Sequence, residues 1–210
     1  MKSNITGLYG ILPADLSTKD LLLKAEEALK GGLQILQFRD KKSGYKRALK
    51  RAAALCELTS SYDVCFIVND SVQRAKEVRA DGVHLGRDDV VNLAAVRDEV
   101  GENMLIGVTC RADAVFAKLA LQQGADYVSF GAVFASQSKP DVPVLGLPRL
   151  QKARQMFPDV NICAIGGITL DNIAQVKQAG ATSAAVISGL FDVEDVQQRT
   201  KDLLQAWEVA

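Results

Sequence analysis

The chain has 210 residues, and its basic and acidic side chains balance at 25 each, so the formal net charge at neutral pH is zero. No global field therefore recruits nucleic acid or an acidic membrane, although a local basic site is compatible with this balance. A composition of 48% apolar and 24% charged residues is typical of a globular protein and argues against fibrous or disordered classes. The first residues lack the apolar core of a signal peptide, and no apolar run approaches membrane-spanning length. We expect a soluble, cytoplasmic protein.

The four cysteines, Cys56, Cys65, Cys110 and Cys163, are widely spaced and form no CxxC pair. Zinc sites and disulfide frameworks usually show closer or regular cysteine spacing. The pattern predicts reduced, mostly buried thiols, as in a cytosolic protein.

Short apolar runs alternate along the chain with longer segments of helical periodicity. The runs are rich in β-branched residues, mostly apolar on both faces and bounded by glycine or aspartate, which is typical of buried parallel strands. We predict strands at residues 7–12, 34–38, 64–68, 82–85, 105–109, 127–131, 162–166 and 184–188. Helices are predicted at residues 21–32, 45–60, 71–80, 91–101, 112–124, 147–157, 169–180 and 193–210.

The ends of these helices carry recognisable signals. Ser71 and Thr169 are placed to cap the third and the seventh helix, and several helices end in glycine. Eight strand–helix repeats without a break in composition predict an α/β protein, a single (β/α)8 TIM barrel over residues 1–210. An open doubly wound sheet is the alternative, but it would normally have fewer strands in this length. In such a barrel the chemistry lies in the loops that follow the strands.

Two carboxylates lie in neighbouring loops of this kind. Asp70 follows the third strand, and Asp89 lies in the loop after the fourth. Adjacent strands are about 5 Å apart, so these carboxylates are placed to share one hydrated Mg²⁺. The alternative is that both are helix caps, Asp70 for the helix near Ser71 and Asp88 or Asp89 for the helix near Val90.

The loop after the second strand presents Gln37, Arg39 and Lys41. In extended chain these positions point the same way, and two cations with an amide suit a polyanion. The alternative is a solvated loop, because Lys41 begins a charged run.

Further polar or glycine-rich loops follow the last three strands. Ser136, Ser138 and Lys139 suit phosphate, with an ordinary polar turn as the alternative. The segments 164–168 and 186–189 contain Gly166-Gly167 and Ser188-Gly189, which predict a phosphate site on backbone amides. His84 lies inside a predicted strand and is expected to be a packed, hydrogen-bonded residue rather than a general base, and Trp207 is expected to pack in the final helix.

The segments QFRDK, VND, ADGVHLGRDD, IGVT, GADYVSFGAVFASQSK, AIGGI and AAVIS resemble, in order and spacing, those of the thiamine phosphate synthase family. The resemblance runs from about Tyr9 to Gly189. It implies a (β/α)8 barrel that couples a pyrimidine diphosphate to a thiazole phosphate and releases pyrophosphate.

The resemblance also implies roles for residues at matching positions. Asp70 and Asp89 would hold Mg²⁺, and Thr109 would lie near the pyrimidine. The pyrimidine diphosphate would be held by Gln37, Arg39, Lys41, Asn69, Thr109 and Lys139, among which Arg39, Lys41, Lys139 and Thr109 are expected to act in catalysis. The thiazole phosphate would be held by Ser136, Ser138, Gly167, Ile187 and Ser188.

The chain departs from the family pattern at two places. Serines stand at 136 and 138 where threonine is common, which keeps a hydroxyl, and Cys110 and Arg111 follow Thr109 in an unusual turn. A related thiazole tautomerase is the nearest alternative, but it relies on a histidine after the fifth strand, where this chain reads TCRAD. A non-catalytic phosphate sensor is a more distant one. Assembly into a homo-oligomer stays open.

Overall fold

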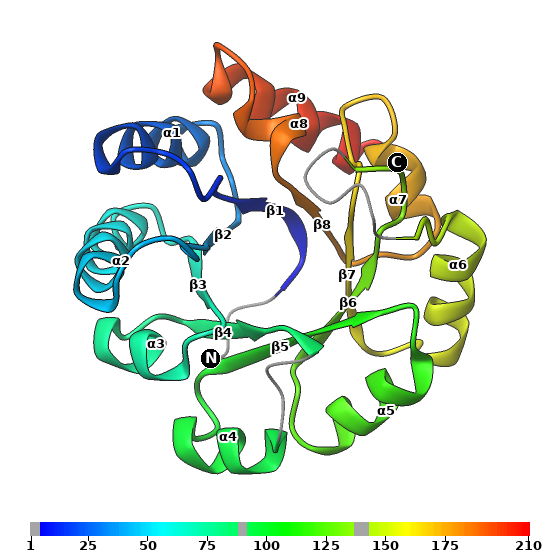
Figure 1. Cartoon of the computed structure of the whole chain (residues 1–210). Coiled ribbons are helices and arrows are strands. Elements are labelled where there is room, and N and C mark those ends of the chain that lie inside the picture. The colour runs from blue at the N-terminus through cyan, green and yellow to red at the C-terminus, as the bar shows by residue number, and fades with distance from the viewer. Residues whose placement is uncertain (1–4, 88–91, 137–142) are drawn as a thin grey trace.

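The computed structural model describes residues 5–87, 92–136 and 143–210, and its sheet is a closed parallel barrel in the order of the chain (Figure 1). The strands are β1 Gly7–Ile11, β2 Ile35–Phe38, β3 Cys65–Asn69, β4 Gly82–Leu85, β5 Leu105–Arg111, β6 Tyr127–Gly131, β7 Asn161–Ile165 and β8 Ser183–Val186. β1 pairs with β8, which closes the barrel and excludes the open sheet. The predicted (β/α)8 barrel is confirmed, and each predicted strand overlaps an observed one.

The helices form a ring outside the strands (Figure 1). They are α1 Thr18–Lys30, α2 Tyr45–Ser60, α3 Val72–Val78, α4 Leu93–Val100, α5 Ala114–Gln122, α6 Leu147–Met156, α7 Ile173–Gln178, α8 Ser188–Phe191 and α9 Val196–Glu208. None of the helices described here is long and apolar enough to cross a membrane.

The helix starts show where local signals were sufficient. Ser71 caps α3, and its hydroxyl accepts the N–H of Arg74, as predicted. The prediction for Thr169 is wrong, because α7 begins at Ile173. Asn172 instead closes a turn there: its Oδ1 accepts the N–H of Thr169 at 2.9 Å, and its Nδ2 donates to the carbonyl of Gly167 at 3.0 Å. This turn fixes the loop after β7.

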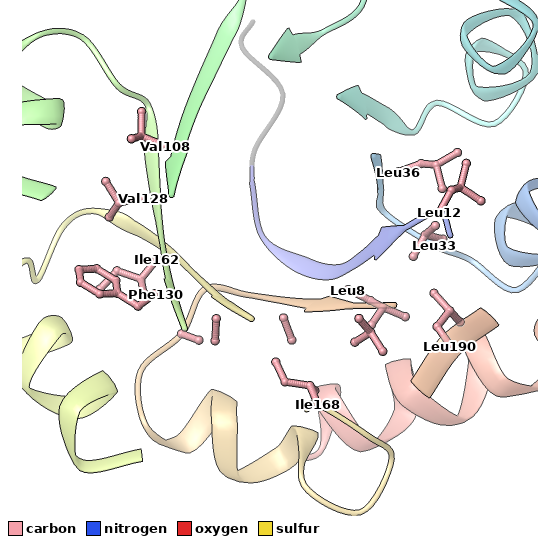
Figure 2. Packing of buried hydrophobic residues seen from close by; sticks show 14 of the residues in the cluster. Leu8, Leu12, Leu33, Leu36, Val108, Val128, Phe130, Ile162, Ile168 and Leu190 are labelled. Carbon is pink, nitrogen blue, oxygen red and sulfur yellow. The ribbon is translucent and has the colours of Figure 1, made fainter. Parts of the chain in front are cut away.

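Side chains on the two faces of the strands form two separate cores. The outer core lies between the barrel and the helices, and Figure 2 shows part of it, where Leu8, Leu33 and Leu190 gather near β1, β2 and α8. The inner core consists almost entirely of residues from the strands, which alternate with the outward-facing ones. Tyr9 and Tyr127 are its largest members, so polar atoms enter the barrel interior.

The residues expected to have only packing roles behave as predicted. Cys65, Cys110 and Cys163 are buried and Cys56 is partly buried, all as thiols rather than disulfides. Burial raises the pKa of Cys110 and of Cys163 to about 12, so neither is a thiolate nucleophile at neutral pH. Trp207 is 7% exposed, and the Lys177 ammonium lies 5.8 Å from its ring centroid.

Candidate functional site

The loops after β2 and β3 meet through an ion pair. Lys41 Nζ lies 2.8 Å from Oδ2 of Asp70, and the two side chains are 52% and 27% exposed. Asp70 has a φ of 63°, in the left-handed region that aspartate tolerates, and its N–H donates to the carbonyl of His84 on β4 at 2.8 Å. Because Ser71 is the cap of α3, the alternative that Asp70 caps this helix is wrong. The Asp70 carboxylate therefore lies at the carboxyl end of the barrel, where it pairs with Lys41 and takes no part in a helix cap.

A buried ion pair anchors the loop that carries Arg39 and Lys41. Arg51 Nη1 donates to Oδ2 of Asp40 at 2.5 Å, with side chains 4% and 1% exposed. Oδ1 of Asp40 accepts the N–H groups of Lys42 at 3.2 Å and Ser43 at 2.9 Å. Burial by itself raises the pKa of Asp40, but these hydrogen bonds and the Arg51 charge outweigh it and lower that pKa. Asp40 thus anchors the loop to the helix below it, while Lys41 and Lys42 stay exposed to solvent.

Several predicted ligands fall outside the described residues. Asp88, Asp89, Ser138 and Lys139 belong to this group, and their roles stay predictions. The helix that Asp88 or Asp89 was expected to cap is capped by Asn92, whose side chain accepts the N–H of Ala95.

A cavity of about 400 Å³ lies between the loops after β7 and β8. It brings together four residues expected to bind phosphate, which are Ser136, Gly167, Ile187 and Ser188. Gly167 has a φ of 63°, and a Cβ there would lie 2.3 Å from the carbonyl oxygen of Ala135. Only glycine fits this position, so the backbone itself forms the wall of the cavity.

The sequence alone did not indicate one cation of this cavity. Arg199 on α9 lines it, and Nη1 of Arg199 lies 3.5 Å from the carbonyl oxygen of Gly189. Asp192 and Thr169 also line the wall. An arginine within an amphipathic helix is usually solvated, so no local sequence pattern indicated that Arg199 lines a cavity.

Polar side chains also run through the barrel below the rim. Gln37 is 2% exposed, and its Nε2 donates to the hydroxyl of Tyr9 at 2.7 Å. The hydroxyls of Tyr9 and Tyr127 are 3.0 Å apart, and Nδ1 of His84 lies 3.0 Å from the hydroxyl of Tyr127. Nε2 of His84 lies 2.8 Å from Oγ1 of Thr109. The expectation of a packed, hydrogen-bonded His84 is confirmed. Two predicted site residues, Gln37 and Thr109, lie at the two ends of this row of hydrogen bonds.

The carboxylate of Asp70 is of the chemical type that a hydrated Mg²⁺ binds. Carboxylate oxygen is the ligand that this ion prefers, and it usually keeps several waters while using one or two carboxylates and a substrate phosphate. Among the described ranges no cluster of three or more His, Cys, Asp or Glu residues is placed to hold a metal.

Comparisons with known proteins agree with one another. Residues 8–190 match the family model described as thiamine monophosphate synthase. The chain is 44% identical over 208 residues to a thiamine-phosphate synthase of Bordetella bronchiseptica, covering 97% of this chain and 95% of that protein. It is 46% identical over 197 residues to one of Acidithiobacillus ferrooxidans, covering 92% and 90%. The solved thiamine phosphate pyrophosphorylase from Pyrococcus furiosus superposes with a TM-score of 0.86 at 32% identity, covering 97% and 96%.

Proposed function

The chain belongs to the thiamine monophosphate synthase family, and from this premise we propose the substrates and the residues of its reaction. The family activity is that of a transferase in thiamine biosynthesis, and it is the activity of this chain. We propose that 4-amino-2-methyl-5-(diphosphooxymethyl)pyrimidine reacts with 4-methyl-5-(2-phosphooxyethyl)thiazole to give thiamine phosphate and pyrophosphate. Two observations support this proposal: the Lys41–Asp70 contact at the rim of the barrel, and the cavity lined by Gly167, Ile187 and Ser188.

The diphosphate is assigned to the loops after β2, β3 and β6. Arg39, Lys41, Asn69 and Lys139 would bind its oxygens, and Asp70 and Asp89 would hold Mg²⁺. The ion would neutralise charge on the leaving pyrophosphate. Gln37 lies deeper, and its burial suits the uncharged pyrimidine end of the same substrate rather than its phosphates. Thr109 would contact this substrate as well. It lies within β5, which continues through Cys110 to Arg111, so the expected turn directly after Thr109 is wrong.

The thiazole phosphate is assigned to the cavity between the loops after β7 and β8. Ser136, Ser138, Gly167, Ile187 and Ser188 would bind it through hydroxyls and backbone amides. Arg199 would add the positive charge that a dianionic phosphate needs.

The proposed reaction breaks the bond between the pyrimidine methylene carbon and the diphosphate oxygen. The thiazole nitrogen then forms a bond to that carbon with its lone pair. No proton leaves this nitrogen, so the chain needs no general base, and both ring nitrogens of His84 are already engaged inside the barrel. Arg39, Lys41 and Lys139 would stabilise the leaving group. Positioning and exclusion of water supply much of the remaining rate.

The direct test is an assay for thiamine phosphate with both substrates, run with and without Mg²⁺. We expect product only when Mg²⁺ and both substrates are present. Product without Mg²⁺ would remove the metal assignment. Conversion of the thiazole phosphate alone to an isomer would instead favour the tautomerase alternative. Saturable binding of thiazole phosphate without turnover would favour the sensor.

Arg199→Gln is expected to raise the KM for the thiazole phosphate about tenfold, the effect of losing one charged hydrogen bond. The KM for the pyrimidine diphosphate should stay within about twofold. The alcohol analogue of the thiazole, which lacks the phosphate, should be used equally well by both proteins. Arg149→Gln, an exposed arginine on α6, is the matched control. Equal losses for the phosphate and the alcohol would contradict a contact between Arg199 and the phosphate.

A further inference from the structure

A continuous chain of buried polar groups joins Gln37 on β2 to Thr109 on β5 through Tyr9, Tyr127 and His84. We propose that this chain fixes His84 with its hydrogen on Nε2, so that the Thr109 hydroxyl is held as a hydrogen-bond donor to the pyrimidine diphosphate. Tyr9, Tyr127 and His84 are then positioning residues, because they act through Thr109. The contact between Thr109 and the substrate rests on the function proposed above.

The chain is deeply buried and closely spaced. Tyr127 is fully buried, Tyr9 is 1% exposed, and the four links from Gln37 to Thr109 measure 2.7, 3.0, 3.0 and 2.8 Å. Gly107 makes the arrangement sterically feasible, since a Cβ there would lie 2.3 Å from the hydroxyl oxygen of Tyr127. A glycine in β5 therefore leaves the space that the tyrosine ring occupies.

The direction of the first hydrogen bond is fixed at the Gln37 end, and we assign the others so that each hydroxyl hydrogen has an acceptor. An amide nitrogen only donates, so the hydroxyl oxygen of Tyr9 accepts from Gln37. In this assignment Tyr9 donates to Tyr127, and Tyr127 donates to Nδ1 of His84. Each hydroxyl hydrogen then has an acceptor within the row of buried polar groups. Burial raises the pKa of both tyrosines, so both hydroxyls keep their hydrogens. Nδ1 of a neutral imidazole that accepts leaves the hydrogen on Nε2.

The Thr109 end then has a defined polarity. Its Oγ1 accepts from Nε2 of His84, and Oγ of Ser129 lies 3.5 Å away as a second, longer donor. With its oxygen used as an acceptor inside the barrel, the hydroxyl of Thr109 has its own hydrogen left to donate. The ring nitrogens and phosphate oxygens of the pyrimidine diphosphate are acceptors. A donor oriented in advance costs no reorganisation during the reaction.

The first test reads the imidazole directly and needs no activity. His84 is the sole histidine of the chain, so in protein made without a histidine tag the nitrogen-15 signals of the imidazole belong to it. These signals separate a protonated from an unprotonated ring nitrogen. We expect hydrogen on Nε2 and none on Nδ1 at neutral pH. Hydrogen on Nδ1 alone, or on both nitrogens, would overturn the proposal.

The second test breaks the chain in the middle. Tyr127→Phe keeps the ring and removes the hydroxyl, and it should lower kcat/KM for the pyrimidine diphosphate about tenfold while the KM for the thiazole phosphate changes less than about twofold. Tyr45→Phe, which removes a hydroxyl bonded to Glu77 on the surface, is the matched control and should behave as the wild type. An equal loss toward both substrates would mean a purely structural role and would contradict the proposal.

The third test asks whether Tyr127 acts through Thr109. Thr109→Val removes the hydroxyl at constant shape, and adding Tyr127→Phe to it should cause little further loss, since the two changes interrupt one path. Losses of kcat/KM that add in the double variant would contradict the proposal. The imidazole signals also distinguish a failure of this proposal from a failure of the proposed function. If the protein shows the expected tautomer but makes no thiamine phosphate, the proposed function is wrong and the row of hydrogen bonds still stands.

Discussion

Replacing Asp70 by asparagine is expected to lower Mg²⁺-dependent turnover on the order of a hundredfold while the barrel stays folded. Asparagine tolerates the left-handed backbone of this position, where φ is 63°, so the change introduces no new strain. It removes the negative charge that would hold Mg²⁺ and that now pairs with Lys41. A partly exposed ion pair contributes only about 0–1 kcal/mol to stability. The measurement is kcat as a function of Mg²⁺ concentration, with thermal unfolding of both proteins.

Asp63→Asn provides a matched control for this variant. Asp63 is exposed, also has a positive φ of 54°, and precedes β3 at the amino end of the barrel, whereas Asp70 follows β3 at the carboxyl end. The same substitution in a similar backbone conformation should leave turnover unchanged there. Near-normal activity of Asp70→Asn at limiting Mg²⁺ would remove Asp70 from the metal site.

The fold was predictable because its signals are repeated and local. Each strand is a short apolar run buried on both faces. With eight such strands in one chain, few architectures leave no strand edge without a hydrogen-bonding neighbour, and the closed barrel is one of them. The helix boundaries were less predictable. Thr169 looks like a good cap, but the side chain of Asn172 organises the turn around Gly167 and delays the helix to Ile173. Which of the two residues, Thr169 or Asn172, lies at the start of the helix depends on where the rest of the fold places the loop around Gly167.

The candidate site was predictable only where polar residues interrupt apolar runs. Gln37 stood out at the end of an apolar run, whereas Thr109 was indicated only by the family resemblance. The structure joins the two through Tyr9, Tyr127 and His84. Nothing in the sequence marked those tyrosines, because a tyrosine within a strand is compatible with either face. Arg199 was missed for a related reason, since its helix face is defined only by the cavity that it meets. Such residues acquire their roles from contacts between distant segments.

Asp40→Asn is expected to have the largest effect on stability, lowering the free energy of unfolding by about 3–5 kcal/mol, as is typical when one partner of a buried ion pair is removed. The asparagine amide nitrogen would face either Nη1 of Arg51 or the N–H groups of Lys42 and Ser43, donor against donor in both orientations. Arg51 would also stay buried without its counter-charge. Asp15→Asn is the matched control, because Asp15 pairs with Lys42 at the surface with side chains 71% and 73% exposed. The control should change stability by less than about 0.5 kcal/mol. Chemical denaturation of the three proteins gives these values.

The pH dependence distinguishes a lost charge from a general packing defect. The pKa of Asp40 is lowered in the folded protein, so its contribution to stability is present above the pKa of the unfolded chain and is lost as pH falls through the folded value. The difference in unfolding free energy between wild type and Asp40→Asn should therefore shrink in acid. A difference that stays constant with pH would contradict the electrostatic origin. Asp40 also anchors the loop of Arg39 and Lys41. At temperatures where the Asp40→Asn protein remains folded, its KM for the pyrimidine diphosphate should therefore be higher than that of the wild type. Such an increase would connect the buried ion pair with the rim where the diphosphate is proposed to bind.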